Sequence, residues 1–284
     1  LPFYKDATAE VNRLLLSVSP STMDRLLKPY RTGKKKGLSS TRPSLIKNKI
    51  PLKLLDNEIK YPGFIEADTV AHCGESLSGE FVSTLTMTDL FCGWTENRAL
   101  WRKTSESVVK QVSRIEKRLP FDLTGFASDN GTEFLNADLH NYLVKNRSIP
   151  LNFVRRRPYK KNDNAHVEQK NYTHVRQLIG YDRIDDEYLV GLMNEIYQAY
   201  FNPLQNFFIP SMKLIKKERH GSKIKKFYDE PKTPYQRLME SSYVPKLQKA
   251  KLLEQYKQKN PFFLRRELDK KLKELFKCID KKKN

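Results

Sequence analysis

The order of apolar segments between residues 61 and 202 constrains the fold more than any other feature of the chain. Three strand-like segments follow one another, and strand-like and helix-like segments then alternate. Consecutive strands favour an antiparallel meander, whereas a helix between two strands allows them to pair in parallel. The pattern therefore predicts an α/β domain with a mixed five-stranded sheet and helices on both faces.

Local signals place the predicted elements. The segment from Phe81 to Thr88 alternates and is rich in Thr and Val, Thr104 is an N-cap candidate, and Gly180 is a helix stop. On this basis we expect strands at residues 64–70, 81–88, 94–101, 123–127 and 151–154. We expect the main helices at residues 104–119, 136–145, 168–179 and 185–200.

The charge of the chain is large and unevenly distributed. The 284 residues carry a net charge of +20, yet residues 61–154 have 9 basic and 12 acidic side chains. A field of this size favours a polyanionic partner, most simply nucleic acid. An acidic centre between basic flanks indicates an enzyme that holds cations with carboxylates.

The segments outside the core, residues 61–202, are predicted to form basic arms. Residues 1–31 are interpreted as the remnant of a helix-turn-helix module or, equally, as a connector pair of helices, and residues 32–60 as a basic linker. Residues 203–244 are a basic region with two short strands, and residues 245–284 are a Lys-rich helical tail. We expect this tail to be separate, so that its removal leaves the core folded.

In the helix-turn-helix interpretation, the second helix has a DNA-binding face and a packing face. The DNA-binding residues are Ser21, Thr22 and Arg25. The packing residues are Val18, Met23, Leu26 and Leu27.

Several classes of protein are excluded by simple counts. Three scattered cysteines do not form a disulfide framework or a cysteine zinc site. No apolar run approaches the roughly 18 residues of a membrane span, and no secretory signal pattern opens the chain. We expect a cytoplasmic, nucleoid-associated protein with no membrane partner. Because the chain begins at Leu1 rather than Met, we also expect it to be truncated at its N-terminus.

Three acidic residues lie where metal ligands can converge. Asp68 is inside an apolar strand, Asp129 directly follows the fourth strand, and Glu168 lies on the helix after a basic loop. The carboxyl ends of neighbouring parallel strands meet at one edge of an open sheet. Ionised carboxylates in such places are costly unless a cation compensates them, and hard divalent ions prefer oxygen ligands.

These acids lie in segments that resemble the three acidic motifs of the retroviral integrase superfamily, which includes the cut-and-paste DDE transposases. Asp68 and Asp129 are 61 residues apart, and Asp129 and Glu168 are 39 apart, which agrees with the family spacing. The resembling motifs are Ile65–Asp68, Asp129–Phe134 and Asn164–Asn171. Four further segments are similar to bacterial insertion-sequence transposases: residues 70–74, 84–89, 93–96 and 157–163.

The resemblance implies a ribonuclease H-like fold and in-line displacement at phosphorus. It implies two Mg²⁺ ions, replaceable by Mn²⁺, with Asp68 bridging both, Asp129 on one and Glu168 on the other. The nucleophile is water in end cleavage and a DNA 3′-hydroxyl in strand transfer. The loop before Glu168 is long and polar, so Glu168 is the member we expect to lie away from the others when no DNA is bound.

Two rival acids are weighed against Glu168. Glu133 belongs to the second motif, and Asp163 is 34 residues past Asp129, near the family spacing. Glu168 is preferred because the sequence around it matches the family helix, whereas Asp163 lies at an N-cap position. His72 and His166 flank the acids and are interpreted mainly as satisfied or surface histidines, with substrate contact as the alternative.

Basic and polar residues around the third motif are candidate DNA contacts. Next to a metal site, cations more often hold phosphates than remain merely solvated. The candidates are Arg155, Arg156, Arg157, Lys160, Lys161, Lys170 and Asn171. Lys runs in the tail add affinity that does not depend on sequence.

The sequence as a whole predicts a DNA transposase of the DDE type that acts on element ends and target DNA as a homo-oligomer. One alternative is a ribonuclease H-like nuclease without strand transfer. The other is a non-catalytic DNA-binding protein derived from a transposase.

Overall fold

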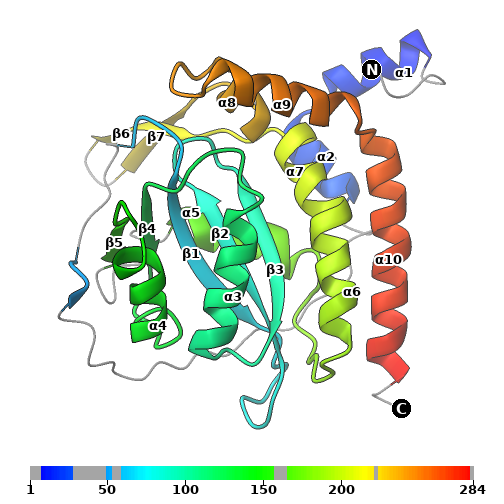
Figure 1. Ribbon diagram of the computed structural model, residues 1–284. Coiled ribbons are helices and arrows are strands. Elements are labelled where there is room, and N and C mark those ends of the chain that lie inside the picture. Colours follow the sequence, from blue (N-terminus) through cyan, green and yellow to red (C-terminus); the bar gives the residue numbers. More distant parts are fainter. Residues whose placement is uncertain (1–7, 28–48, 53–58, 157–164, 221–222, 282–284) are drawn as a thin grey trace.

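The structure is a computed structural model that describes residues 8–27, 49–52, 59–156, 165–220 and 223–281. Its centre is a five-stranded sheet in the order β3-β2-β1-β4-β5 (Figure 1). The strands are β1 (Phe64–Ala71), β2 (Val82–Asp89), β3 (Thr95–Trp101), β4 (Gly125–Ser128) and β5 (Asn152–Arg155).

The pairing of the strands confirms the predicted mixed sheet. β1 pairs antiparallel with β2, and β2 pairs antiparallel with β3. β4 joins the other edge of β1 in parallel, and β5 joins β4 in parallel. A meander of three strands followed by two parallel strands is the ribonuclease H-like arrangement, and each of the five strands lies within two residues of its predicted bounds.

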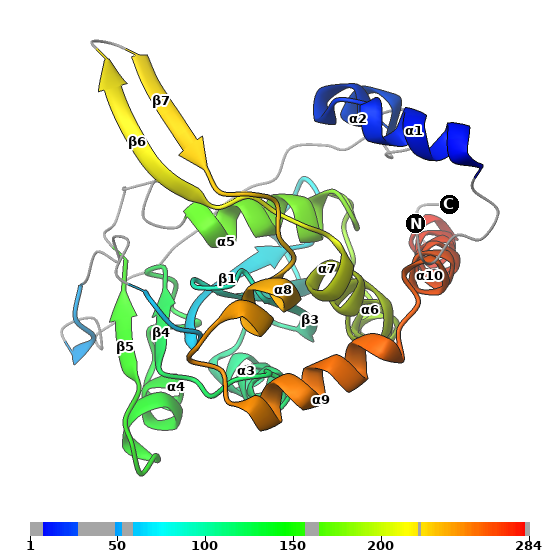
Figure 2. The same ribbon diagram turned by 90° about the horizontal axis from the view of Figure 1, so that it is seen from above.

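Helices cover both faces of this sheet, as predicted. The helices of the first face are α3 (Ser105–Glu116) and α4 (Ala137–His140), which continues as a π-helical turn, η3 (Asn141–Lys145). The helices of the second face are α5 (Ala165–Lys170), η5 (Asn171–Arg176), α6 (Leu189–Glu195), η6 (Ile196–Phe201) and α7 (Asn202–Phe208). Figure 2 shows α3 and α4 on one side of the sheet and α5 on the other.

Alternation along the strands explains the two covered faces. Ile65 and Ala67 of β1 pack in one cluster with Val112 of α3. Residues of opposite parity face the other way, and Val82 and Ala99 pack with α6 and η6. Because successive side chains point to opposite faces, one continuous strand serves two cores.

The C-terminal part of the chain begins with a two-stranded ribbon and ends in three helices. The ribbon consists of β6 (Leu214–His220) and β7 (Lys223–Tyr228). The helices are α8 (Pro234–Glu240), α9 (Lys246–Lys257) and α10 (Pro261–Lys281).

The expectation of a separate tail is wrong. Leu264, Leu268 and Leu275 of α10 are buried in the same cluster as α6 and η6, and Leu252 of α9 is buried against α8 and the β2–β3 turn. The many Lys residues suggest a fully solvated arm. In the structure they occupy only one face of each helix, because Lys alternates with Leu at helical spacing and the Leu face is buried. Residues 245–281 therefore complete the fold.

The N-terminal helices α1 (Ala9–Ser17) and α2 (Pro20–Leu27) form as predicted, but without the expected core. Met23, Leu26 and Leu27 are exposed, and Val18 is only half-buried. Ser21 and Arg25 are exposed and Thr22 is half-buried, with the Thr22 amide donating to Ser19 Oγ at 3.2 Å. The DNA-binding role of Ser21, Thr22 and Arg25 stays a prediction.

Candidate active site

Asp68 and Asp129 lie side by side at the centre of the sheet. The parallel register of β1 and β4 ends with the pair Ala67 and Ser128; the next residues are Asp68, within β1, and Asp129, which directly follows β4. Adjacent strands are about 4.8 Å apart, so the two carboxylates emerge from neighbouring backbones. The pairing of β1 with β4 thus brings Asp68 and Asp129 together, as the sequence predicts.

The electrostatics of Asp68 reflect this proximity. The pKa of Asp68 is raised to about 8, mainly by burial and also by the charge of Asp129. The amide of Thr69, which donates to Asp68 Oδ1 at 2.7 Å, acts in the opposite direction. Two carboxylates in a partly buried place repel each other until a cation or a proton compensates them.

Asn171 ties the helix that carries Glu168 to this carboxylate pair. Its Nδ2 donates to Asp68 Oδ2 at 2.7 Å, and Asn171 is the first residue of the π-helical segment η5. A π-helical turn shifts the face of a helix, and such turns are frequent at functional sites. The structure therefore makes Asn171 a positioning contact of Asp68, buried in the protein, and not the predicted DNA contact.

Glu133 and Lys103 complete the surroundings of the carboxylate pair. Thr69 Oγ1 donates to Glu133 Oε1 at 3.0 Å, and Lys103 forms an ion pair with the same Glu133 oxygen. The charges of Glu133 and Lys103 act on Asp68 in opposite directions. Glu133 is thus neutralised by its own cation, which argues against it as the third metal ligand.

Lys103 escaped the sequence analysis. It follows Arg102, which adopts the left-handed backbone conformation (φ 52°) that residues other than Gly and Asn rarely adopt. That conformation turns the chain out of β3 and leads Lys103 toward Glu133. A lone Lys after a strand has no sequence signal that distinguishes it from a surface charge.

Glu168 lies apart from the other two acids. It is exposed in the first turn of α5, and its charge acts on Glu66, two residues before Asp68 on the same face of β1. Among the residues that the structure describes, no three His, Cys, Asp or Glu side chains are close enough together to hold a metal ion. The structure thus brings two members of the predicted triad together, and the third stands on the helix that borders them.

Glu66 holds the start of that helix. Its carboxylate accepts a hydrogen bond from Arg156 Nη2 at 2.6 Å and another from the Val167 amide at 3.1 Å. The side chain of Arg156 is only 4% exposed and that of Glu66 is fully buried. Arg156 is therefore an internal partner of Glu66, and the prediction that it contacts DNA is wrong.

The remaining predicted DNA contacts have mixed outcomes. Arg155 is half-buried and donates to the Ile50 carbonyl at 3.0 Å. Lys170 is half-buried, and its pKa is lowered to about 8 mainly by burial and also by the charge of Arg237, so its position does not favour a DNA contact. Arg157, Lys160, Lys161 and the rival acid Asp163 lie outside the described residues.

The residues at this site fit a hard divalent cation. The donors are carboxylate oxygens, and the amide oxygen Asn171 Oδ1 is buried with no hydrogen-bond partner in the described part of the chain. An orphaned buried oxygen beside two mutually repelling carboxylates is a set that Mg²⁺ satisfies. Asp68 and Asp129 would hold the metal, and Glu168 would reach it by a change at the start of α5.

No protein-family model matches the chain. The uncharacterized protein y4rM of Sinorhizobium fredii (strain NBRC 101917 / NGR234) is 35% identical over 235 residues. The match covers 82% of this chain and 66% of that relative, just under two thirds of its length.

Two solved structures are similar to parts of the chain. The catalytic core domain of BIV integrase is 17% identical, with a TM-score of 0.29 over 37% of this chain and 62% of that one. The simian T-cell lymphotropic virus intasome in complex with PP2A regulatory subunit B56 gamma is 14% identical, with a TM-score of 0.43 over 84% of this chain and 69% of that one. Similarities this low do not bear on function.

Proposed function

We propose that this chain is a DDE-type polynucleotidyl transferase, a transposase that cuts DNA at the ends of a mobile element and joins the freed 3′-hydroxyl to target DNA. The observation that carries the proposal is the position of Asp68, in the central strand β1, beside Asp129, which directly follows the adjacent parallel strand β4. The resemblance of the three acidic segments to integrase motifs supports the same chemistry, and the ribonuclease H-like sheet is the fold on which the motifs are expected.

The residues of the site have distinct parts in this chemistry. Asp68, Asp129 and Glu168 would hold two Mg²⁺ ions, for which Mn²⁺ can substitute. When bound, the ions supply activation of the attacking oxygen and charge stabilisation of the leaving oxygen. Asn171 keeps one oxygen of Asp68 in place, and Lys103 keeps Glu133 neutralised beside it. Glu66 anchors the helix from which Glu168 must reach the pair.

The partners of this activity follow from the same proposal. DNA is the substrate, both as element ends and as target, and a homo-oligomer brings two ends together. No helix in the described part of the chain combines the length and hydrophobicity that crossing a bilayer requires. We place the protein with DNA, in the cytoplasm of a bacterial cell and associated with the nucleoid.

A nicking and joining assay tests the proposal. The purified chain is incubated with duplexes that carry the inverted repeats flanking the gene, with Mg²⁺, with Mn²⁺ or with chelator. Metal-dependent nicking at the repeat end followed by joining to a second duplex supports a transposase. Nicking without joining indicates a nuclease, and binding without either reaction indicates a non-catalytic protein.

A further inference from the structure

The β6–β7 ribbon stands apart from the rest of the fold. Its two strands pair only with each other and do not join the five-stranded sheet. Figure 2 shows the ribbon projecting beyond the body of the molecule, on the side of the sheet that α5 covers. The side chain of Asp68 lies on that same side, because Asn171 at the start of η5 bonds to it.

The surface of the ribbon is unusual for an arm that has no partner. Ile224 is 58% exposed and Tyr228 is 48% exposed. A two-stranded hairpin is marginally stable in water unless something packs on it. Residues 214–228 also carry six basic side chains against one acidic side chain, Glu218.

The strand register sorts these charges onto two faces. Residues that are directly opposite each other share a face, and successive pairs alternate. One face holds the pairs Lys216–Phe227, Glu218–Lys225 and His220–Lys223, and the other holds Lys217–Lys226 and Arg219–Ile224. Tyr228, two residues beyond Lys226, lies on the second of these faces.

Two lysines of the first face have partners within the ribbon. Lys216 Nζ is 2.6 Å from Glu218 Oε1, and His220 Nε2 is 3.5 Å from Glu218 Oε2. The ammonium of Lys225 lies 4.9 Å from the centre of the Phe227 ring, a cation–π contact. Lys216 and Lys225 of this face therefore already have partners in the ribbon itself.

The second face has no such compensation at its centre. Lys217 and Lys226 are directly opposite each other, and neither forms an ion pair with a described residue. Like charges at directly opposite positions destabilise a strand pair. A polyanion that lies along this face would remove the repulsion and cover the exposed Ile224 and Tyr228.

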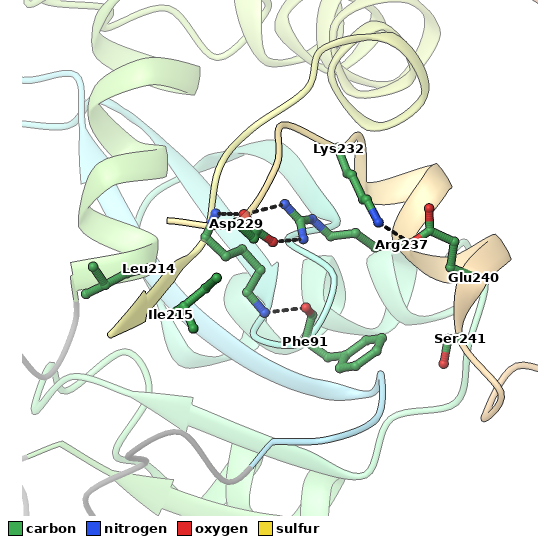
Figure 3. A pocket seen from close by; sticks show the side chains of 9 residues that line it. Phe91, Leu214, Ile215, Asp229, Lys232, Arg237, Glu240 and Ser241 are labelled. Carbon is green, nitrogen blue, oxygen red and sulfur yellow. Dashed lines mark hydrogen bonds and ion pairs between the residues drawn. The ribbon is translucent and has the colours of Figure 1, made fainter. Parts of the chain in front are cut away.

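Hydrogen bonds and an ion pair attach the base of the ribbon to the core. Lys213 donates to the carbonyl oxygens of Leu90 and Phe91 in the β2–β3 turn, and Asp229 pairs with Arg237 of α8 (Figure 3). Phe91, Lys213, Asp229 and Arg237 line a cavity of about 390 Å³, in which Lys232 also pairs with Glu240. The cations of the cavity are thus engaged in holding the ribbon, while Lys217 and Lys226 form no ion pair with a described residue.

We propose that the β6–β7 ribbon binds duplex DNA in the major groove, with the Lys217–Lys226 face toward the DNA. A major groove about 12 Å wide admits a two-stranded ribbon. Lys217 and Lys226 bind phosphates, while Ile224 and Tyr228 contact base edges. The proposal rests on the proposed function, because the duplex is the one whose phosphodiester reacts at Asp68 and Asp129.

The competing explanation is that the Lys residues only protect an exposed edge from pairing with another chain. That explanation treats both faces alike, since edge protection depends on charge and not on which face carries it. It also leaves the exposed Ile224 and Tyr228 unexplained. The two explanations therefore differ in what the separate faces do.

A pair of matched variants tests the proposal. Lys217→Ala with Lys226→Ala strips the proposed DNA face, and Lys216→Ala with Lys225→Ala makes the same change of net charge on the other face. Binding of a fluorescent duplex of mixed sequence is measured in chelator at several KCl concentrations, after circular dichroism confirms that both variants are folded. Chelator stops any cleavage, so a failure to cut DNA does not affect this result.

The expected result is a loss of about 2 in the slope of log affinity against log salt for the first variant, because each phosphate contributes about 0.9. The slope of the second variant stays at the wild-type value. Methylation of guanine N7 in the major groove weakens binding of the wild-type chain and not of the first variant. Equal slopes for the two variants, or binding that ignores N7 methylation, overturn the proposal.

Discussion

Glu66 and Arg156, 90 residues apart in the chain, form a buried ion pair in which Arg156 Nη2 donates to Glu66 Oε1 at 2.6 Å. The other carboxylate oxygen of Glu66 accepts from the Val167 amide. Arg156 is the last described residue before the segment 157–164, and Val167 lies just after it. One carboxylate of the central strand therefore fixes both ends of the connection that leads to Glu168.

Removal of Glu66 should cost much more stability than removal of a surface acid. Glu66→Ala leaves the Arg156 charge buried without its partner, and we expect a loss of about 3 kcal/mol in the free energy of unfolding. Urea denaturation measures it. Glu80→Ala is the control, because the Glu80–Arg102 pair is about half exposed and its loss costs under about 1 kcal/mol. Equal losses for the two variants would show that the buried Glu66–Arg156 pair contributes no more to stability than the exposed Glu80–Arg102 pair.

The sheet could be predicted from the sequence because its signals are local. The Thr-rich alternation of β2 and the Thr104 cap of α3 form in the structure where the pattern indicates them. The closeness of Asp68 and Asp129 follows from the parallel pairing of β1 with β4, an arrangement that a helix between two strands allows. These features depend on neighbours in the sequence and on general rules of strand pairing.

The rest depends on contacts that a sequence pattern does not encode. In the sequence, Arg156 is an arginine among basic residues, as a DNA contact would be. Only its ion pair with the buried Glu66 makes it an internal residue. The Lys-rich sequences of α9 and α10 indicate an arm because the Leu face that the structure buries is narrow. Lys103 reaches Glu133 through a single left-handed residue.

The carboxylates should separate catalysis from binding. Asp129→Asn keeps the shape of the side chain but removes a charge on which a divalent ion depends, so Mg²⁺-dependent cleavage should fall by at least about 10²-fold. DNA affinity should hold or rise, because one repulsion with phosphate is relieved. Cleavage rates and binding by fluorescence anisotropy are compared for the same preparations.

The same assay identifies the third acid. Glu168→Gln should be as inactive as Asp129→Asn, while Asp163→Asn and Glu133→Gln should retain most of the activity. Glu133 is already paired with Lys103, so it has the least reason to hold a metal. An inactive Asp163→Asn beside an active Glu168→Gln would falsify the assignment of Glu168.

Asp68 should be a site where function opposes stability. Burial and the charge of Asp129 raise the pKa of Asp68 to about 8, so without metal the fold at neutral pH takes up a proton at Asp68 that the unfolded chain does not hold, and this lowers stability. Asp68→Asn should raise the free energy of unfolding by about 1 kcal/mol without metal. Added Mg²⁺ should stabilise the wild-type chain and not the variant, as thermal melts with and without the ion will show. If Asp68→Asn is less stable than the wild type without metal, the Asp68 carboxyl group does not destabilise the metal-free fold.

The tail should be part of the folding unit. Leu268 of α10 is buried against α6 and η6, and Leu268→Ala should cost about 3 kcal/mol through lost burial and the cavity left behind. Leu247 on α9 is 70% exposed, and Leu247→Ala should change stability by less than about 0.5 kcal/mol. Similar small values for both would restore the interpretation of a separate tail.

Stability should fall in acid because two histidines are buried in the neutral form. The Nε2 atom of His72 is 2.8 Å from Thr84 Oγ1, which is 3.1 Å from the hydroxyl of Tyr197. Burial lowers the pKa of His72 to about 3, and it lowers the pKa of His174 as well. The unfolded chain therefore binds protons at a higher pH than the fold does, so stability present above the ordinary histidine value of about 6.5 is lost as the pH falls toward 3.

The contribution of His72 can be isolated by its pH dependence. Between pH 7 and pH 5, protonation of His72 in the unfolded chain should lower the free energy of unfolding by about 2 kcal/mol. Each pH unit below about 6.5 costs about 1.4 kcal/mol until His72 titrates in the folded form as well. His72→Gln should reduce the difference between the unfolding free energies at the two pH values by that amount, whatever its effect at pH 7. His220→Gln is the control, because that ring lies on the exposed ribbon. If His72→Gln leaves the pH difference unchanged, the ring is not held neutral by the fold.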